Sequence, residues 1–149
     1  GKSVLREVTL DEIMANIPKL REFAGDRAIM RAIHFENENE RVTAQTEALR
    51  KGDLDEFFKG VLASGDSSFK YLQNVYSEQG LSLALCVTEN VLKGKKAAWR
   101  VHGGGFAGTI QAFVRNEDVP MFKKALDGAF GEGAVTILKV RPYGAIRID

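Results

Sequence analysis

The stretch Arg100–Thr109 reads RVHGGGFAGT and places a glycine cluster between two segments in which polar and apolar side chains alternate. Glycine costs about 0.5–1 kcal/mol relative to alanine inside regular structure, so a cluster indicates a demand of backbone geometry, such as a positive φ angle or the close approach of another molecule. The alternation in residues 98–102 and 109–114 has the period of two that is typical of β-strands. The stretch therefore predicts an antiparallel hairpin closed by a glycine turn.

Helices precede this hairpin, and one follows it. Thr9 and Glu12 have the spacing of a capping box that opens a helix, and Pro18 is expected to bend or end that helix. Further helices are predicted over Arg27–Lys51, from Asp53 onward, over Leu81–Lys93 and from an N-cap at Asn116 to Phe130. The segments Ala134–Val140 and Tyr143–Ile148 are predicted as two more strands. This order favours an α+β fold with a helical layer packed on an antiparallel sheet.

Composition bounds the class of protein. The 149 residues fit a single domain spanning 1–149, and 44% hydrophobic with 28% charged residues is ordinary globular usage. With 21 Lys and Arg against 20 Asp and Glu, no nucleic-acid partner is expected, because the chain lacks a concentrated positive charge. No apolar run approaches the roughly 20 residues of a membrane span. The single cysteine, Cys86, lies in an apolar stretch and is expected to be buried, which fits a cytoplasmic protein.

The glycine turn has two chemical interpretations. The spacing of Gly103, Gly105 and Gly108 matches G-x-G-x-x-G, which in a strand-to-helix turn indicates a dinucleotide site. Here a strand follows, so the helix N-terminus on which that chemistry depends is missing. Successive main-chain amides, including that of Gly104, can still converge on a phosphate or a sugar hydroxyl. The other interpretation is a flexible hairpin turn without a ligand.

Several side chains around the turn are candidates for function. Arg100 and His102 alternate toward the same face and are possible anchors for a ligand, and the alternative for Arg100 is a solvated or ion-paired group. Phe106 is expected to plug the space under the loop. Trp99 and Phe113 can stack on a base or a sugar, but strand aromatics mostly pack against covering helices, and we expect that role here.

A further polar set lies on the long helix predicted over residues 27–51. His34, Glu38 and Arg41 share one face, because side chains three and four apart in a helix are neighbours. Two potential ligands at this spacing can hold a metal ion, but no third histidine, cysteine pair or acidic cluster completes a site. We therefore expect a structural network and no metal site.

Together these motifs resemble those of the GHMP family of small-molecule kinases, in its galactokinase form. Residues 100–109 are similar to the family's third motif: arginine, a hydrophobic residue, threonine or histidine, then Gly-Gly-Gly-Phe-Gly-Gly. Residues 31–42 look like the family's arginine-alanine, histidine, glutamate and arginine-valine pattern on one long helix, and residues 51–68 continue in the family's order. Ala107 replaces a usual glycine, Thr109 a frequent cysteine, and Gly65 a histidine found in many relatives.

The resemblance implies the C-terminal domain of a galactokinase, which is a helical layer on a four-stranded antiparallel sheet of ferredoxin-like type. In galactokinases ATP and galactose bind between two domains, and the γ-phosphoryl group moves to the C1 hydroxyl of the sugar with Mg²⁺ present. The loop made of Gly103, Gly104, Gly105, Phe106 and Gly108 is then expected to bind substrate or phosphate. No catalytic residue and no metal ligand is expected in this chain.

In galactokinases the sugar signature, the phosphate loop and the catalytic aspartate belong to an N-terminal domain, and the resemblance implies that this chain does not include that domain. We therefore expect a fragment that folds but does not phosphorylate galactose alone, and whose partner is its own N-terminal domain. Two other functions stay open. One is a non-catalytic sugar- or nucleotide-sensing protein on the same scaffold, and the other is a free-standing ligand-binding module.

Overall fold

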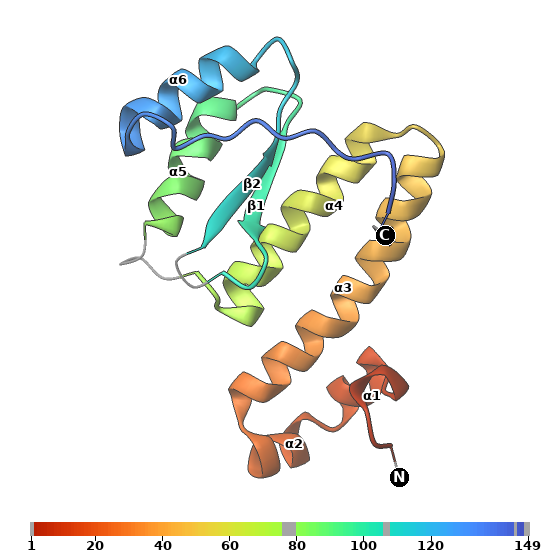
Figure 1. Ribbon diagram of the computed structural model, residues 1–149. Coiled ribbons are helices and arrows are strands. Elements are labelled where there is room, and N and C mark those ends of the chain that lie inside the picture. Colours follow the sequence, from red (N-terminus) through yellow and green to blue (C-terminus); the bar gives the residue numbers. More distant parts are fainter. Residues whose placement is uncertain (1, 76–79, 106–107, 145, 148–149) are drawn as a thin grey trace.

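Figure 1 shows the chain as a computed structural model, which describes residues 2–75, 80–105, 108–144 and 146–147. Within these residues six α-helices, one short 3-10 helix, one π-helical segment and two strands form an α+β fold. In chain order they are η1 (Leu5–Glu7), α1 (Leu10–Ala15), α2 (Ile17–Ala24), α3 (Asp26–Arg50), α4 (Leu54–Ser67), η2 (Ser68–Leu72), α5 (Leu81–Leu92), β1 (Ala98–His102), β2 (Thr109–Phe113) and α6 (Val119–Phe130). In the part of the chain that the structure describes, no helix is both long and apolar enough to cross a membrane.

The strands β1 and β2 form the predicted antiparallel hairpin, in which Arg100 pairs with Gln111. Side chains alternate between the two faces of this sheet. One face is covered by α4, where the ring of Phe57 meets the ring of Phe113 edge-on with centroids 5.4 Å apart. The helices α5 and α6 cover the other face, and α3 packs against α4 on the side away from the sheet (Figure 1).

Two groups of apolar side chains form the core. The first lies between α5, α6 and the sheet, and Trp99 packs against it. The second joins Val75, Leu81 and Val101. The buried members of the first group are Leu92, Ala97, Phe122 and Leu126. The expectation that Trp99 and Phe113 pack against covering helices is therefore confirmed.

Local signals set the helix ends as predicted. Thr9 Oγ1 accepts a hydrogen bond from the amide of Glu12 at 3.2 Å, and Glu12 Oε2 accepts one from the amide of Thr9 at 2.8 Å, which completes the capping box. The Asp53 carboxylate caps α4 by accepting a first-turn amide at 2.9 Å. The helix α3 ends at Arg50, and Gly52 has a φ of 70°, which allows the sharp turn into α4.

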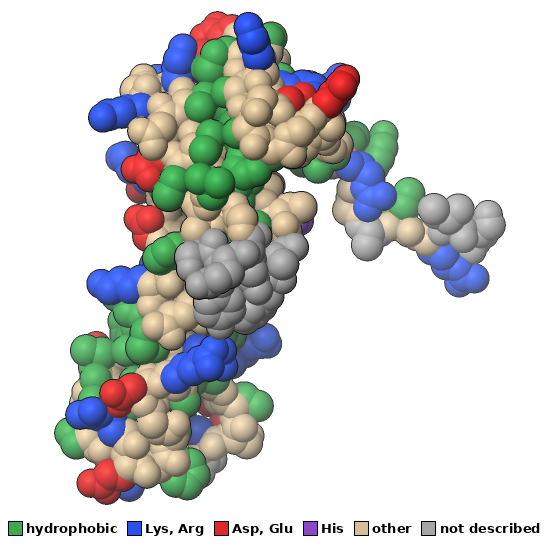
Figure 2. Space-filling view, turned by 90° about the vertical axis from the view of Figure 1, so that its left-hand side faces the viewer, with side chains coloured by type: hydrophobic (Ala, Val, Ile, Leu, Met, Phe, Trp, Pro, Cys, Tyr) green, Lys and Arg blue, Asp and Glu red, His purple; other side chains and the backbone are tan. Residues whose placement is uncertain are grey.

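The prediction of two more strands, at Ala134–Val140 and Tyr143–Ile148, is wrong. None of the described residues in this range is in a strand, so the described sheet has two strands and not four. After α6 the chain bonds back to that helix, because the Asp127 carboxylate accepts from the amide of Val135 at 3.1 Å. It then runs in front of the sheet and away from the body (Figures 1 and 2), which leaves Leu138 83% exposed. An alternating pattern becomes a strand only where a neighbouring edge receives its main-chain groups.

Two smaller predictions also need correction. The helix α6 begins at Val119 and not directly after Asn116, because residues 116–118 form a turn and Asp118 occupies the capping position. Cys86 is exposed. The reason is that α5 buries a different face, which carries Leu81, Thr88 and Leu92.

Candidate functional site

The glycine turn that joins β1 to β2 is described at Gly103–Gly105 and at Gly108. Gly103 and Gly105 have φ angles of 62° and 78°, in the left-handed region that favours glycine. Gly103 and Gly104 are exposed, and a Cβ atom on either would meet no atom of the described residues within 4 Å. Among the described residues, nothing covers this side of the turn. Phe106, which was expected to plug the loop, lies outside the described residues.

The other side of the turn is filled by Asn74, which the sequence did not reveal. A Cβ atom on Gly105 would overlap the main-chain oxygen of Asn74 and lie 2.9 Å from its Cγ, so only glycine fits there. The Asn74 side chain donates from Nδ2 to the carbonyl of Gly104 at 3.1 Å. Asn74 is 0% exposed, and among the described residues its Oδ1 has no hydrogen-bond partner. The two contacting residues are 30 apart, so no local spacing signals this contact.

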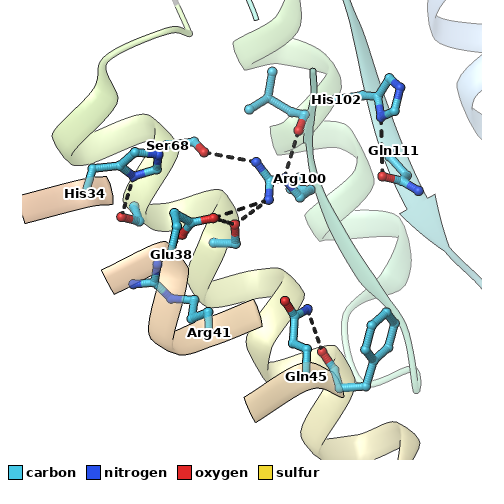
Figure 3. Close-up of polar contacts among 12 residues, drawn as sticks. His34, Glu38, Arg41, Gln45, Ser68, Arg100, His102 and Gln111 are labelled. Carbon is cyan, nitrogen blue, oxygen red and sulfur yellow. Dashed lines mark hydrogen bonds and ion pairs between the residues drawn. The ribbon is translucent and has the colours of Figure 1, made fainter. Parts of the chain in front are cut away.

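Arg100 points into a polar cluster between β1, α3 and α4 (Figure 3). Its guanidinium donates to the hydroxyl of Ser64 and, at 3.3 Å, to that of Ser68. The same Ser64 hydroxyl donates to Glu38, whose Oε2 lies 3.7 Å from Nη1 of Arg100. Charge-assisted hydrogen bonds of this kind are stronger than neutral ones. Arg100 is thus an ion-paired group that ties the hairpin to the helices, which was the alternative to a ligand anchor.

Glu38 connects this cluster to the rest of α3. It pairs with Arg41 one turn further on. One turn before it, Nδ1 of His34 shares a hydrogen bond with the hydroxyl of Ser67 at 2.9 Å. Burial lowers the pKa of His34, and Glu38 opposes this effect while Arg41 and Arg100 add to it. These contacts confirm the structural network predicted for His34, Glu38 and Arg41. The described residues hold no group of three or more His, Cys, Asp or Glu placed for a metal ion.

The helix α4 approaches β1 closely at Gly65. A Cβ atom there would lie 3.1 Å from the Cβ of Arg100 and 3.2 Å from the carbonyl oxygen of Trp99. A histidine, which the resemblance places here in many relatives, would require the helix or the strand to shift by a few tenths of an ångström. The hydroxyls of the neighbouring serines bond within the cluster. This part of α4 therefore holds the helix to the hairpin.

His102 ends β1 beside the turn and is exposed. Its Nδ1 lies 3.4 Å from Oε1 of Gln111 on β2. Together with Gly108 and Thr109 it lines a groove of about 1520 Å³, whose other walls come from α4, β2 and the segment after α6. The structure thus places His102 and Gly108 on one concave surface, and Gly103–Gly105 are not among its lining residues. The Arg100 side chain is engaged between β1, α3 and α4.

Fold and site define an α+β domain with an exposed glycine turn beside a groove. No family model matches the chain. A galactokinase of Limosilactobacillus reuteri is 39% identical over 107 residues, which cover 66% of this chain and 24% of that protein. A galactokinase of Actinobacillus pleuropneumoniae is 29% identical over 126 residues, which cover 85% of this chain and 32% of that protein.

A solved structure gives the same result. The crystal structure of Lactococcus lactis galactokinase complexed with galactose is similar with a TM-score of 0.69 and 27% identity, over 89% of this chain and 32% of that one. This chain is a homologue of galactokinases and corresponds to the C-terminal domain that its motifs indicated. It spans about a quarter to a third of the length of these relatives, 24% and 32% for the two sequences.

Proposed function

We propose that this chain is the C-terminal domain of a galactokinase-like sugar kinase, which transfers the γ-phosphoryl group of ATP to the C1 hydroxyl of galactose. The observation that carries the proposal is the open, exposed side of the turn at Gly103 and Gly104. Main-chain amides suit the charge on phosphoryl oxygens, because they offer fixed partial positive charge without a side chain in the way. The similarity to a galactokinase solved with galactose supports the choice of reaction.

In this proposal the chain positions the reactants and leaves the reacting groups to an N-terminal domain. The turn at Gly103–Gly105 and Gly108 binds a phosphate or sugar hydroxyls, and the exposed His102 stands beside it as a polar anchor. Mg²⁺ and most contacts to ATP are assigned to the N-terminal domain. Because phosphoryl transfer depends on positioning and charge stabilisation, one wall of the cleft alone gives no turnover.

The first test joins the N-terminal domain of a galactokinase to this chain. The corresponding region of Lactococcus lactis galactokinase is replaced by residues 1–149, and ADP release is measured with ATP, Mg²⁺ and galactose. The isolated chain is expected to release no ADP above a no-protein blank, and the chimaera is expected to turn over only with sugar present. Turnover by the isolated chain contradicts the proposal that the reacting groups belong to the N-terminal domain. A folded chimaera that binds ATP and galactose without phosphoryl transfer favours the non-catalytic sensing function.

A matched pair of glycine variants then assigns the activity to the turn. Gly104 is outside the left-handed region and its Cβ direction is empty, so Gly104→Leu is expected to keep the fold and to block a ligand. Gly128 in α6 has an equally empty Cβ direction, so Gly128→Leu is the control. Loss of turnover in the first variant alone supports a ligand at the turn, and equal turnover in both argues against it.

A further inference from the structure

Asn74 contacts the glycine turn with both its main chain and its side chain. The Cβ direction of Gly105 is closed by the main-chain oxygen of Asn74, and the side-chain amide holds the carbonyl of Gly104 at 3.1 Å. Asn74 itself is 0% exposed. The turn is therefore supported from within by one residue that lies far from it in the sequence.

The chain is bent to deliver Asn74 to this place. The π-helical segment η2 ends at Leu72, and the next residue, Gln73, has a φ of 55°, in the left-handed region that a residue with a side chain adopts at a cost. The amide of Gln73 donates to the carbonyl of Ser68 at 2.8 Å, which fixes that bend. Asn74 follows directly. A strained residue immediately before a buried contact indicates that the contact is specified by the fold.

Stability alone does not explain an asparagine here. Its Oδ1 is buried and finds no hydrogen-bond partner in the part of the chain that the structure describes, which is costly for a polar atom removed from water. The next residue, Val75, is apolar and belongs to the core. An apolar residue at position 74 would avoid the unpaired oxygen, so the amide group is kept for the donor that it gives to Gly104.

We propose that Asn74 is a positioning residue, which orients the peptide between Gly104 and Gly105 for ligand binding. The C=O and N–H of a trans peptide point in opposite directions, and none of the described peptide bonds is cis. A Gly104 carbonyl held inward by Asn74 therefore turns the N–H of Gly105 away from Asn74. This inference rests on the proposed function for the role of that N–H, but the orientation itself is independent of it.

The orientation is tested on the 149-residue chain without any ligand. Asn74→Leu keeps the branched shape and removes the donor, and Asn74→Asp keeps the shape and replaces the donor by an oxygen. Both are expected to shift the amide signals of Gly103–Gly105 in ¹⁵N spectra and to speed their hydrogen exchange. Asn90→Leu is the matched control, because Nδ2 of Asn90 also donates to a carbonyl, at 2.8 Å within α5. Unchanged glycine signals in folded variants, or failure of both variants to fold, overturn the proposal.

The consequence for activity is tested in the chimaera. Asn74→Leu is expected to lower kcat by about 10- to 100-fold with a smaller change in KM and an unchanged melting temperature, because misplacement of a positioning group by about 1 Å costs up to 100-fold. A purely structural residue would lower the melting temperature instead. If Gly104→Leu loses turnover but Asn74→Leu leaves the glycine signals unshifted, only the role of Asn74 is overturned. If Asn74→Leu shifts the glycine signals but Gly104→Leu keeps normal turnover, Asn74 still orients the turn and the proposed function is contradicted.

Discussion

Replacing each of the three consecutive glycines 103–105 of the turn by alanine is expected to lower the free energy of unfolding by a different amount. Gly104→Ala has an allowed φ and an empty Cβ direction, so its cost is expected to stay within about 0.5 kcal/mol. Gly103→Ala has equal space but a φ of 62°, for which the left-handed region costs about 1–2 kcal/mol. Gly105→Ala adds the overlap with Asn74, and overpacking costs typically about 1–3 kcal/mol more. Its total is therefore about 2–5 kcal/mol, out of a typical stability of about 5–15 kcal/mol.

The free energy of unfolding of each variant is measured by urea denaturation. Trp99 is the single tryptophan of the chain and packs against the core, so its fluorescence reports the loss of tertiary structure. Gly128→Ala in α6 controls for the removal of a glycine from an open position. The expected order of cost is Gly105, then Gly103, then Gly104. If Gly105→Ala is as stable as Gly103→Ala, the close packing of Asn74 under the turn is refuted.

Three further predictions follow from the polar groups. Arg100→Met is expected to lower the free energy of unfolding in urea by about 1–3 kcal/mol, because three side-chain hydrogen bonds are lost. The exposed control Arg115→Met should lower it by less than about 0.5 kcal/mol. Equal losses in the two variants contradict a stabilising role of the cluster around Arg100. Burial lowers the pKa of His34 below its ordinary 6.5, so its contribution to stability is present above that pH and is lost as the pH falls through the lower folded pKa. His34→Gln should reduce the change in the free energy of unfolding with pH in this range. An unchanged pH dependence argues against a lowered pKa of His34. Thr88 is 0% exposed with an unpaired hydroxyl, so Thr88→Val should keep or raise the melting temperature, and a clear fall would contradict that environment.

The local parts of the fold were predictable because their causes lie within a few residues. The capping box at Thr9 and the Asp53 cap involve partners three residues away, and Gly52 supplies its own turn geometry. The alternation on either side of the glycine turn likewise predicted β1 and β2. In the site, His34 and Glu38 were predictable as members of a network, because residues one turn apart on a helix are neighbours.

The rest depends on contacts between distant segments. Residues 134–140 alternate like a strand, yet pairing needs an edge, and the Asp127 carboxylate takes the amide of Val135. The contact of Asn74 with Gly104 was not predictable for the same reason, because it joins positions 30 residues apart. Periodicity describes which faces a segment offers, but it does not say which other segment meets them.

Three side chains that hydrogen-bond to the hairpin come from one continuous segment, residues 64–74. Ser64 and Ser68 hold Arg100 on β1, and Asn74 holds the turn that follows β1. Such a brace works only if α4 lies close to the strand, and at Gly65 a side chain would keep the two apart. The glycine that departs from the family pattern is therefore part of the same arrangement that shapes the turn. Since the serines of this segment bond within the protein, the proposed function assigns ligand recognition to the main chain of Gly103 and Gly104 and to the exposed His102.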